Sequence, residues 1–228
     1  MKRWIYHQNV DDQKVKELSK SLNLDPSLAT TLVTRGIDTF DKAKQYFRPS
    51  LDELYDPFLM KNMDTAVSCI QKHVSQSHKI LVYGDYDVDG TTSVAMMYEF
   101  LSSICPHVSY YIPDRDTEGY GVSRKGIEYA IEENFSLIIT LDCGIRALEN
   151  ISLARENNLD IIICDHHLPG EALPDATAIL DPKQPECKYP FKELSGCGVG
   201  FKLIQAYSKK YGIPFSQISS FLDLVSIS

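Results

Sequence analysis

The feature that most restricts the fold of this 228-residue sequence is an alternation of short apolar runs with helix-length segments from residue 78 onward. The clearest runs are Ile80–Val82, Leu137–Leu141 and Ile161–Cys164, and such nearly continuous runs are typical of parallel strands buried on both faces. Strands that alternate with helices form right-handed βαβ units. The sequence therefore predicts an α/β fold with a parallel β-sheet flanked by helices. The expected strands are 80–83, 108–112, 137–141 and 161–164, with a further short strand in the stretch 178–182, and the expected helices are 91–104, 123–132, 146–157, 198–211 and one from near Ser216.

Residues 1–76 have a different pattern, with small helices separated by proline and glycine. Helices are expected at 13–22, 27–33 and 40–47, and a further helix that Asp64 would cap leads into the first strand. Ser75-Gln76-Ser77 marks the expected boundary, so we predict two domains, a helical segment 1–76 and an α/β domain 77–228. The N-terminal segment contains no catalytic constellation, which favours a packing or substrate-guiding role.

Composition excludes some classes of protein. A net charge of −8 argues against generic polyanion binding, because non-specific affinity for nucleic acid comes mainly from lysine and arginine. The six cysteines show no Cys-x-x-Cys spacing, so we expect reduced core thiols in a cytoplasmic protein. The N-terminus lacks the apolar stretch of a signal peptide, and no run approaches the length of a membrane span. No membrane partner is expected.

Three alternating carboxylates, Asp85, Asp87 and Asp89, follow the first strand. Because like charges so close together repel one another, a bound cation is the simplest way to keep all three ionised. Oxygen ligands favour Mg²⁺ or Mn²⁺. An EF-hand calcium loop would need a glutamate at its twelfth position, which is Met96 here. A haloacid-dehalogenase-type phosphatase, with Asp87 and Asp89 as nucleophile and acid/base, is the serious alternative. Asp89 as a helix cap would explain one carboxylate but not three.

Two more strands end in residues of the same kind. Asp142 follows 137–141, while Asp165, His166 and His167 follow 161–164. The carboxyl ends of parallel strands meet at one edge of the sheet, where α/β proteins bind ligands. Paired imidazoles beside these carboxylates favour a metal site and have no role in the dehalogenase-type alternative.

A two-metal site is the natural arrangement of these groups. Asp142 is expected to bridge two ions about 3.5–4 Å apart. One ion would be held by Asp85 and Asp87, and the other by Asp89 and His166. Asp165 is expected to orient the histidines. His167 is ambiguous between orienting its neighbours and contacting a phosphate, and we favour the phosphate contact.

Two further stretches offer substrate contacts. Arg115 lies in a glycine-containing loop and presents a fork suited to phosphate, and Ser123 is placed to cap the next helix. A surface ion pair would explain Arg115 equally well. Gly198 and Lys202 belong to a glycine-rich helix start that could bind an anion, although close helix packing also explains the glycines. The candidate substrate-binding residues are therefore Arg115, Ser123, Gly198 and Lys202.

As a set, these stretches resemble the DHH phosphoesterases, and within them closely the RecJ-type exonucleases. The segments that carry the resemblance are 83–92, 112–121, 140–144, 165–170 and 196–201. The resemblance implies a 5′-to-3′ exonuclease that hydrolyses single-stranded DNA in repair and recombination with two Mn²⁺ or Mg²⁺ ions. It places the metal ligands on Asp85, Asp87, Asp89, Asp142 and His166. Single-stranded DNA is the implied partner, with a single-strand-binding protein and a helicase.

One departure from that family concerns the last residues. The family's helix Leu-Asp-Leu-Val continues into a motif that ends in a further metal-ligating Asp, whereas this sequence stops at Ser228. We therefore expect an N-terminal fragment, truncated before its last motif. A DHH phosphodiesterase for cyclic dinucleotides or oligoribonucleotides, and a non-catalytic replication scaffold, are the alternative functions.

Overall fold

The structure is a computed structural model that describes residues 10–228. The chain divides into two compact units, one up to Leu54 and one from Tyr55 to Ser228. The first unit contains α1 (Asp12–Leu22), α2 (Pro26–Thr34), α3 (Phe40–Phe47) and a 3₁₀ turn (Leu51–Glu53). Its small core consists of Val15, Leu18, Ala29, Leu32 and Ala43.

The second unit is built on a five-stranded, fully parallel sheet in the order β2-β1-β3-β4-β5. This confirms the predicted fold class. The strands are β1 (Ile80–Gly84), β2 (Val108–Tyr111), β3 (Leu137–Leu141), β4 (Asp160–Cys164) and β5 (Ala178–Leu180). The helices are α4 (Met63–Ser75), α5 (Val88–Ser102), α6 (Arg124–Glu132), α7 (Leu148–Glu156), α8 (Gly196–Tyr211), α9 (Phe215–Ile218) and α10 (Leu222–Val225), with 3₁₀ turns at Pro57–Leu59 and Ser219–Phe221.

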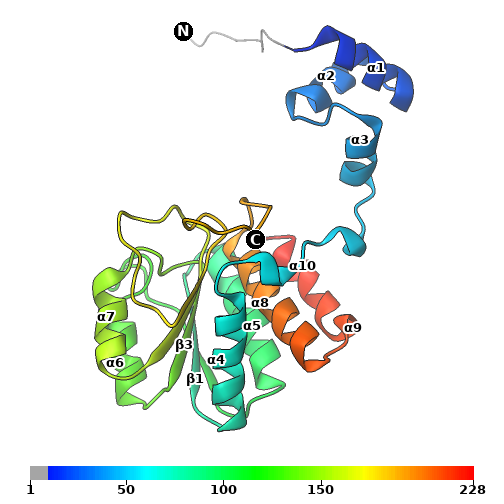
Figure 1. Ribbon diagram of the computed structural model, residues 1–228. Coiled ribbons are helices and arrows are strands. Elements are labelled where there is room, and N and C mark those ends of the chain that lie inside the picture. Colours follow the sequence, from blue (N-terminus) through cyan, green and yellow to red (C-terminus); the bar gives the residue numbers. More distant parts are fainter. Residues whose placement is uncertain (1–9) are drawn as a thin grey trace, which may run out of the picture. The chain divides into compact units, whose positions relative to one another are not determined.

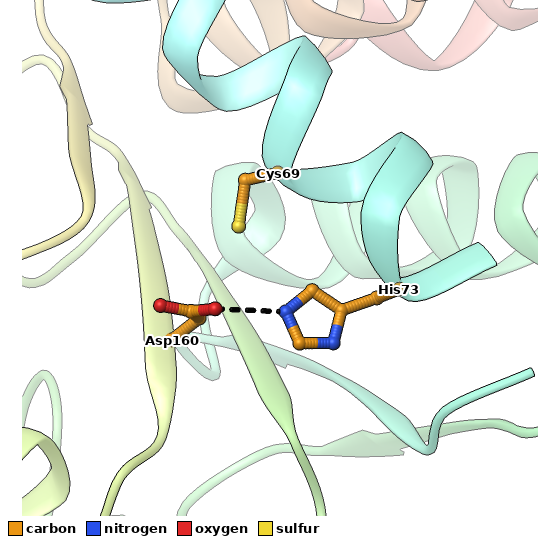
Figure 2. Close-up of side chains that lie close together, drawn as sticks. All are labelled: Cys69, His73 and Asp160. Atoms are coloured by element: carbon orange, nitrogen blue, oxygen red, sulfur yellow. Dashed lines mark hydrogen bonds and ion pairs between the residues drawn. The ribbon is translucent and has the colours of Figure 1, made fainter. Parts of the chain in front are cut away.

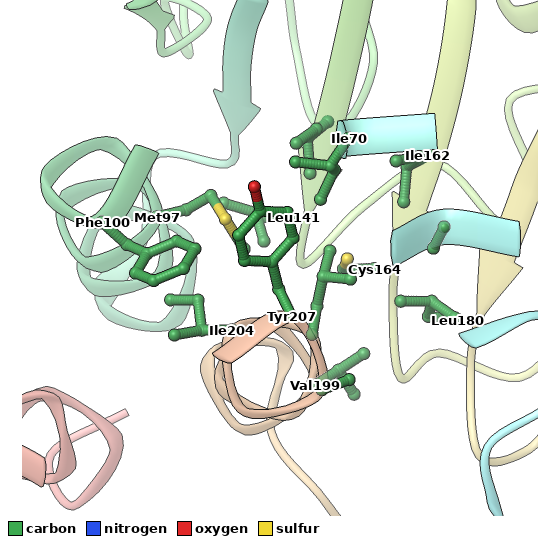
Figure 3. Close-up of a cluster of buried hydrophobic side chains, with 14 of the residues drawn as sticks. Ile70, Met97, Phe100, Leu141, Ile162, Cys164, Leu180, Val199, Ile204 and Tyr207 are labelled. Atoms are coloured by element: carbon green, nitrogen blue, oxygen red, sulfur yellow. The ribbon is translucent and has the colours of Figure 1, made fainter. Parts of the chain in front are cut away.

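Helices cover both faces of the sheet (Figure 1), and the side chains of the strands alternate between these two layers. In β1, Ile80 and Val82 pack toward α4, α5 and α8, whereas Leu81 and Tyr83 pack toward α6 and α7. Figure 3 shows the first of these cores, where Phe100 of α5 meets Tyr207 of α8 edge to face at 5.7 Å between ring centroids. Because both faces are covered, β1 and β3 are buried along their whole length, whereas the edge strand β2 is partly exposed.

The boundary between the units differs from the expected one at residue 76. Helix α4 buries Ala66, Val67 and Ile70 in the same core as β1, so it belongs to the α/β unit. A short polar link between α4 and β1 resembles a domain linker in sequence but is a tight connection here. Asp64 is not the cap of α4; Asn62 holds that position in a left-handed conformation and makes no side-chain cap.

The strand order reverses between β1 and β3, which lie side by side although β2 intervenes in the sequence. Crossovers leave this point in opposite directions, so a crevice opens at the carboxyl ends of the two strands. Asp85 and Asp142 follow these strands. All six cysteines are free and five are buried, as expected of core thiols. Between residues 10 and 228, no helix combines the length and apolar character needed to cross a membrane.

Candidate metal centre

The loop after β1 places one carboxylate under the sheet edge and one at the surface. Asp85 is fully buried; its Oδ1 accepts a hydrogen bond from the N–H of Tyr86 at 2.9 Å. Its Oδ2 has no hydrogen-bond partner within residues 10–228. Burial raises the pKa of Asp85. Asp87 is exposed and caps α5 by accepting from the N–H of Gly90 at 2.9 Å. The capping residue is thus Asp87 rather than Asp89.

Asp89 reaches across to the start of α8. Its two carboxylate oxygens accept hydrogen bonds from the N–H groups of Gly196 and Cys197, each at 2.7 Å. Free N–H groups at a helix N-terminus favour a negative charge. The glycine-rich start of α8 therefore does hold an anion, as the sequence suggested, but in this structure the anion is the Asp89 carboxylate.

Asp142 lies at the centre of the site. Its backbone is left-handed, with φ of 59°, and its N–H donates to the carbonyl of Cys164 at 2.9 Å. The side chain is 2% exposed, and burial raises its pKa to about 6. Its Oδ1 lies 3.1 Å from Nε2 of His166 but makes no hydrogen bond within the described chain. The left-handed backbone and the burial together hold this carboxylate away from bulk solvent.

The two histidines have different partners. Nε2 of His166 faces Asp142 and also lies 3.6 Å from Oδ2 of Asp89, and the Asp142 carboxylate raises the pKa of His166. The ring of His167 is held at both nitrogens, with Asp165 at 2.7 Å from Nδ1 and the hydroxyl of Tyr120 at 3.0 Å from Nε2. The structure thus places Asp165 as an orienting group for the ring of His167 rather than that of His166.

Asp165 also organises the backbone around the histidines. Its Oδ1 accepts from the N–H groups of His166 and His167, and its Oδ2 accepts from the N–H of Ile145. Burial alone would raise the pKa of Asp165, but these hydrogen bonds outweigh it and the pKa is lowered. A charged Asp165 therefore locks the loop after β4 against the loop after β3.

The ligand atoms form two overlapping groups that fit divalent cations. Asp85, Asp87 and Asp142 form one group, and Asp142, His166 and His167 form another, with ligand atoms within 4.8 Å of one another in each. Asp142 is common to both, which is the arrangement that a bridging ligand requires. Buried carboxylate oxygens without partners are costly unless a cation is bound. The residues present therefore suit Mn²⁺ or Mg²⁺, with imidazole favouring Mn²⁺.

A fourth strand tip carries a carboxylate that sequence reasoning passed over. Asp181 directly follows β5 and is fully buried; its Oδ1 accepts from the N–H of Lys183, while its Oδ2 has no partner within the described residues. Burial raises its pKa to about 6. The signal was available, because Asp181 follows an apolar run just as Asp142 does.

The expected substrate contacts divide into one exposed residue and three that serve the fold. Arg115 is exposed, and its guanidinium stacks over the ring of Tyr86 at 5.4 Å from the centroid. Ser123 is buried and caps α6, so its hydroxyl is occupied. The N–H of Gly198 donates to the hydroxyl of Ser195. Lys202 is 4% exposed, and its ammonium donates to the carbonyl of Tyr55 and to Gln205, none of which lies at a strand tip. The polar groups of Ser123, Gly198 and Lys202 are thus occupied by contacts within the chain, and their roles as substrate contacts stay predictions.

A second cluster with metal-ligand side chains lies at the opposite, amino-terminal edge of the sheet (Figure 2). It contains Cys69 and His73 of α4 and Asp160 at the start of β4, with Nε2 of His73 3.0 Å from the carboxylate. Asp160 also pairs with Lys72 at 2.9 Å and Arg155 at 3.1 Å. Two cations already balance this carboxylate, so we interpret the cluster as a polar network that ties α4 to β4.

Replacing Asp160 with asparagine should lower the free energy of unfolding at pH 7 by about 2–3 kcal/mol, because charge-assisted hydrogen bonds are lost. Burial would raise the pKa of Asp160, but the hydrogen bonds from Lys72 and His73 outweigh it and lower the pKa below its ordinary 3.8. The contribution is therefore complete above pH 3.8 and is lost as the pH falls through the lowered value. Urea unfolding of both proteins at pH 7 and pH 3.5 measures this, with the exposed Asp175→Asn as control. A difference that grows in acid would contradict it.

The fold and the site together define a class of protein: an α/β domain whose carboxylates and histidines gather where the strand order reverses, between β1 and β3. The sequence profile of the DHH family, N-terminal domain, matches residues 79–227, so the chain belongs to the DHH family. It is 48% identical over 204 residues to the single-stranded-DNA-specific exonuclease RecJ of Bacillus subtilis, covering 90% of this chain and 26% of that protein. It is 30% identical to the Escherichia coli protein of the same name, over 90% of this chain and 36% of that protein.

Solved structures give the same result. A crystal structure of exonuclease RecJ bound to manganese matches with a TM-score of 0.67 and 30% identity, over 74% of this chain and 42% of that one. RecJ of Thermus thermophilus in complex with Mn²⁺ matches with a TM-score of 0.74 and 26% identity, over 94% of this chain and 30% of that one. The expected DHH and RecJ likeness is thus confirmed. The chain spans about a quarter to two fifths of these relatives' lengths.

Proposed function

We propose that the chain is the metal-binding part of a metal-dependent phosphodiesterase that removes nucleotides from single-stranded DNA in the 5′-to-3′ direction. The observation that carries this proposal is the pair of ligand groups that share Asp142. One ion would be held by Asp85, Asp87 and Asp142 and the other by Asp142 and His166, with Asp89, 3.6 Å from His166 but in neither group, as a further ligand. The two ions would activate water and stabilise the charge that develops on phosphorus. Support for the substrate comes from the relatives named single-stranded-DNA-specific exonuclease, and RecJ structures were solved with Mn²⁺.

The chain's own residues would position the phosphate. Asp165 raises the pKa of His167, so a larger fraction of this imidazole is protonated near neutral pH. The ring is 41% exposed, and a phosphate oxygen would have to replace the Tyr120 hydroxyl, which lies 3.0 Å from Nε2, to accept a hydrogen bond from that nitrogen. Arg115 stacks on Tyr86, which lies between Asp85 and Asp87 in the sequence, and this guanidinium would pair with a second phosphate oxygen.

Partners and location follow from the proposed substrate. Single strands arise when a duplex is unwound and are normally covered by protein, so we also propose a helicase and a single-strand-binding protein as partners in DNA repair and recombination. A DNA substrate and free thiols in the core are consistent with a cytoplasmic enzyme.

In the complete protein that carries these residues, Mn²⁺ should support release of nucleotides from single-stranded DNA blocked at its 3′ end but not at its 5′ end. Chelation with EDTA should reduce the rate to background, because the five proposed ligands would hold the cations and none of them would replace the metal-activated water as the nucleophile. Oligonucleotides labelled internally, with matched RNA strands, measure polarity and sugar preference. Degradation of a 5′-blocked strand from a free 3′ end would contradict the polarity, and absence of hydrolysis with Mn²⁺ or Mg²⁺ would contradict the activity.

A further inference from the structure

A pocket of about 640 Å³ opens directly beside the candidate metal centre. Asp165, His166 and His167 line it, so the same loop after β4 borders both the pocket and the ligand groups. The far wall comes from other elements: the loop 120–122, the loop after β3 and the start of α7. Its volume lies in the range of about 300–1,000 Å³ typical of small-molecule sites.

The lining combines apolar side chains with polar and basic ones. Val122, Ile145, Ala147 and Leu168 supply apolar surface, while Arg146 and Lys183 are basic. Asp165 is the single acidic lining residue, and its oxygens already accept hydrogen bonds from backbone N–H groups and from His167. This combination suits a flat, mostly apolar group that is attached to an anion.

Hydrogen bonds between the loops hold the pocket in shape. Nε of Arg146 donates to the carbonyl of Leu168 at 2.8 Å, and the amide of Asn150 donates to the carbonyl of Val122 at 2.7 Å. These contacts join the start of α7 to both neighbouring loops. The cavity is therefore preformed rather than assembled by the ligand, which lowers the entropic cost of binding.

We propose that this pocket binds the nucleoside adjoining the phosphate that is cleaved at the metal centre. The inference rests on the proposed function, since it requires a phosphodiester at the metals. The pocket is continuous with the ligand groups, so a nucleoside attached to that phosphate can enter it. The polar groups of Tyr120, Asn150 and Asp165 on its walls already form hydrogen bonds within the protein, so little base preference is expected.

The test compares ligands with and without a nucleoside on the Mn²⁺-loaded complete protein that carries these residues. Calorimetry measures the affinity of methyl phosphate, deoxyadenosine 5′-monophosphate and deoxyadenosine 3′-monophosphate. One of the nucleotides should bind at least about tenfold more tightly than methyl phosphate. Tighter binding of the 5′-monophosphate would assign the pocket to the first nucleoside of the strand that is retained. Tighter binding of the 3′-monophosphate would assign it to the nucleoside that leaves.

Variants link that difference to the pocket. Ala147→Phe fills the cavity and should remove most of the nucleotide's advantage, while methyl phosphate and Mn²⁺ bind as before. Leu168→Ala removes an apolar wall and should reduce the advantage, whereas Leu148→Ala, on an exposed leucine outside the lining, should not. The leucine pair changes only exposed side chains, so it remains informative if Ala147→Phe misfolds.

Two results would overturn the inference in distinguishable ways. Equal affinities for methyl phosphate and both nucleotides, or an advantage that all three variants retain, would overturn the nucleoside pocket alone. Absence of Mn²⁺ or methyl phosphate binding would overturn the proposed function, and the inference with it.

Discussion

Replacing Asp142 with asparagine should lower Mn²⁺-dependent turnover of the complete protein by at least about 10³-fold, because a ligand common to both groups acts on both ions. Asparagine tolerates the left-handed backbone at this position, so the variant should fold. The corresponding Asp85→Asn removes a ligand from one group only and should have an equal or smaller effect.

The same variant should be more stable than wild type when metal is absent. Burial raises the pKa of Asp142 to about 6, which means that the folded state disfavours its charge. This penalty is present above pH 6 and disappears as the pH falls and the carboxyl is protonated in the folded state. At pH 8 with EDTA, asparagine should therefore raise Tm, whereas added Mn²⁺ should raise Tm of wild type far more than that of the variant.

Turnover, calorimetric Mn²⁺ binding and thermal unfolding are measured on wild type, Asp142→Asn and Asp85→Asn. Near wild-type turnover in Asp142→Asn, with two Mn²⁺ still bound, would contradict the bridging role. A Tm of Asp142→Asn below that of wild type in the absence of metal would show that Asp142 is a structural residue rather than a carboxylate held for a cation.

The strands, and the polar residues that follow them, were predictable because both depend on the local sequence pattern. The apolar run of β3 is buried on both faces, and a parallel strand that helices cover on both faces requires such a composition. The carboxylates then had to share one edge, because parallel strands end on the same side. The predicted boundary at residue 76 differs from the observed one because α4 packs on a face of the sheet. The sequence of α4 shows that the helix has an apolar face, but not which part of the chain covers that face.

The site was predictable only as a set of residue types. That Asp89 is held by the N–H groups of Gly196 and Cys197, 107 and 108 residues away, depends on the packing of α5 against α8. Likewise, Lys202 follows a glycine-rich stretch suited to an anion, yet its side chain extends to Tyr55 and away from the strand tips. Backbone donors and side-chain direction are set by tertiary contacts, so motif position alone did not predict the internal contacts of Lys202 and Gly198.

Gly196→Ala should destabilise the protein by about 2–3 kcal/mol, because the added methyl group has no space. A Cβ at this position would lie 2.5 Å from Cβ of Asp142 and 2.8 Å from its Cα. Asp142 directly follows β3, so its backbone cannot move aside unless the end of that strand moves with it. Relief requires the start of α8 to shift away from Asp142. That shift would also lengthen the hydrogen bond from the N–H of Gly196 to Asp89, so Mn²⁺ affinity should fall by about 10–100-fold.

Gly198→Ala is the matched control on the same turn of α8. Its Cβ would meet only the side chain of Leu194 at 3.3 Å and 3.5 Å and Oγ of Ser195 at 3.5 Å, and alanine is favoured over glycine within helices by about 1 kcal/mol. We therefore expect stability equal to or above that of wild type, with Mn²⁺ affinity unchanged. Urea unfolding and calorimetry of both variants measure these quantities. Equal behaviour of the two variants would show that the close approach of α8 to Asp142 does not hold the metal centre together, and a selective loss of nucleotide binding in Gly198→Ala would restore Gly198 as a substrate contact.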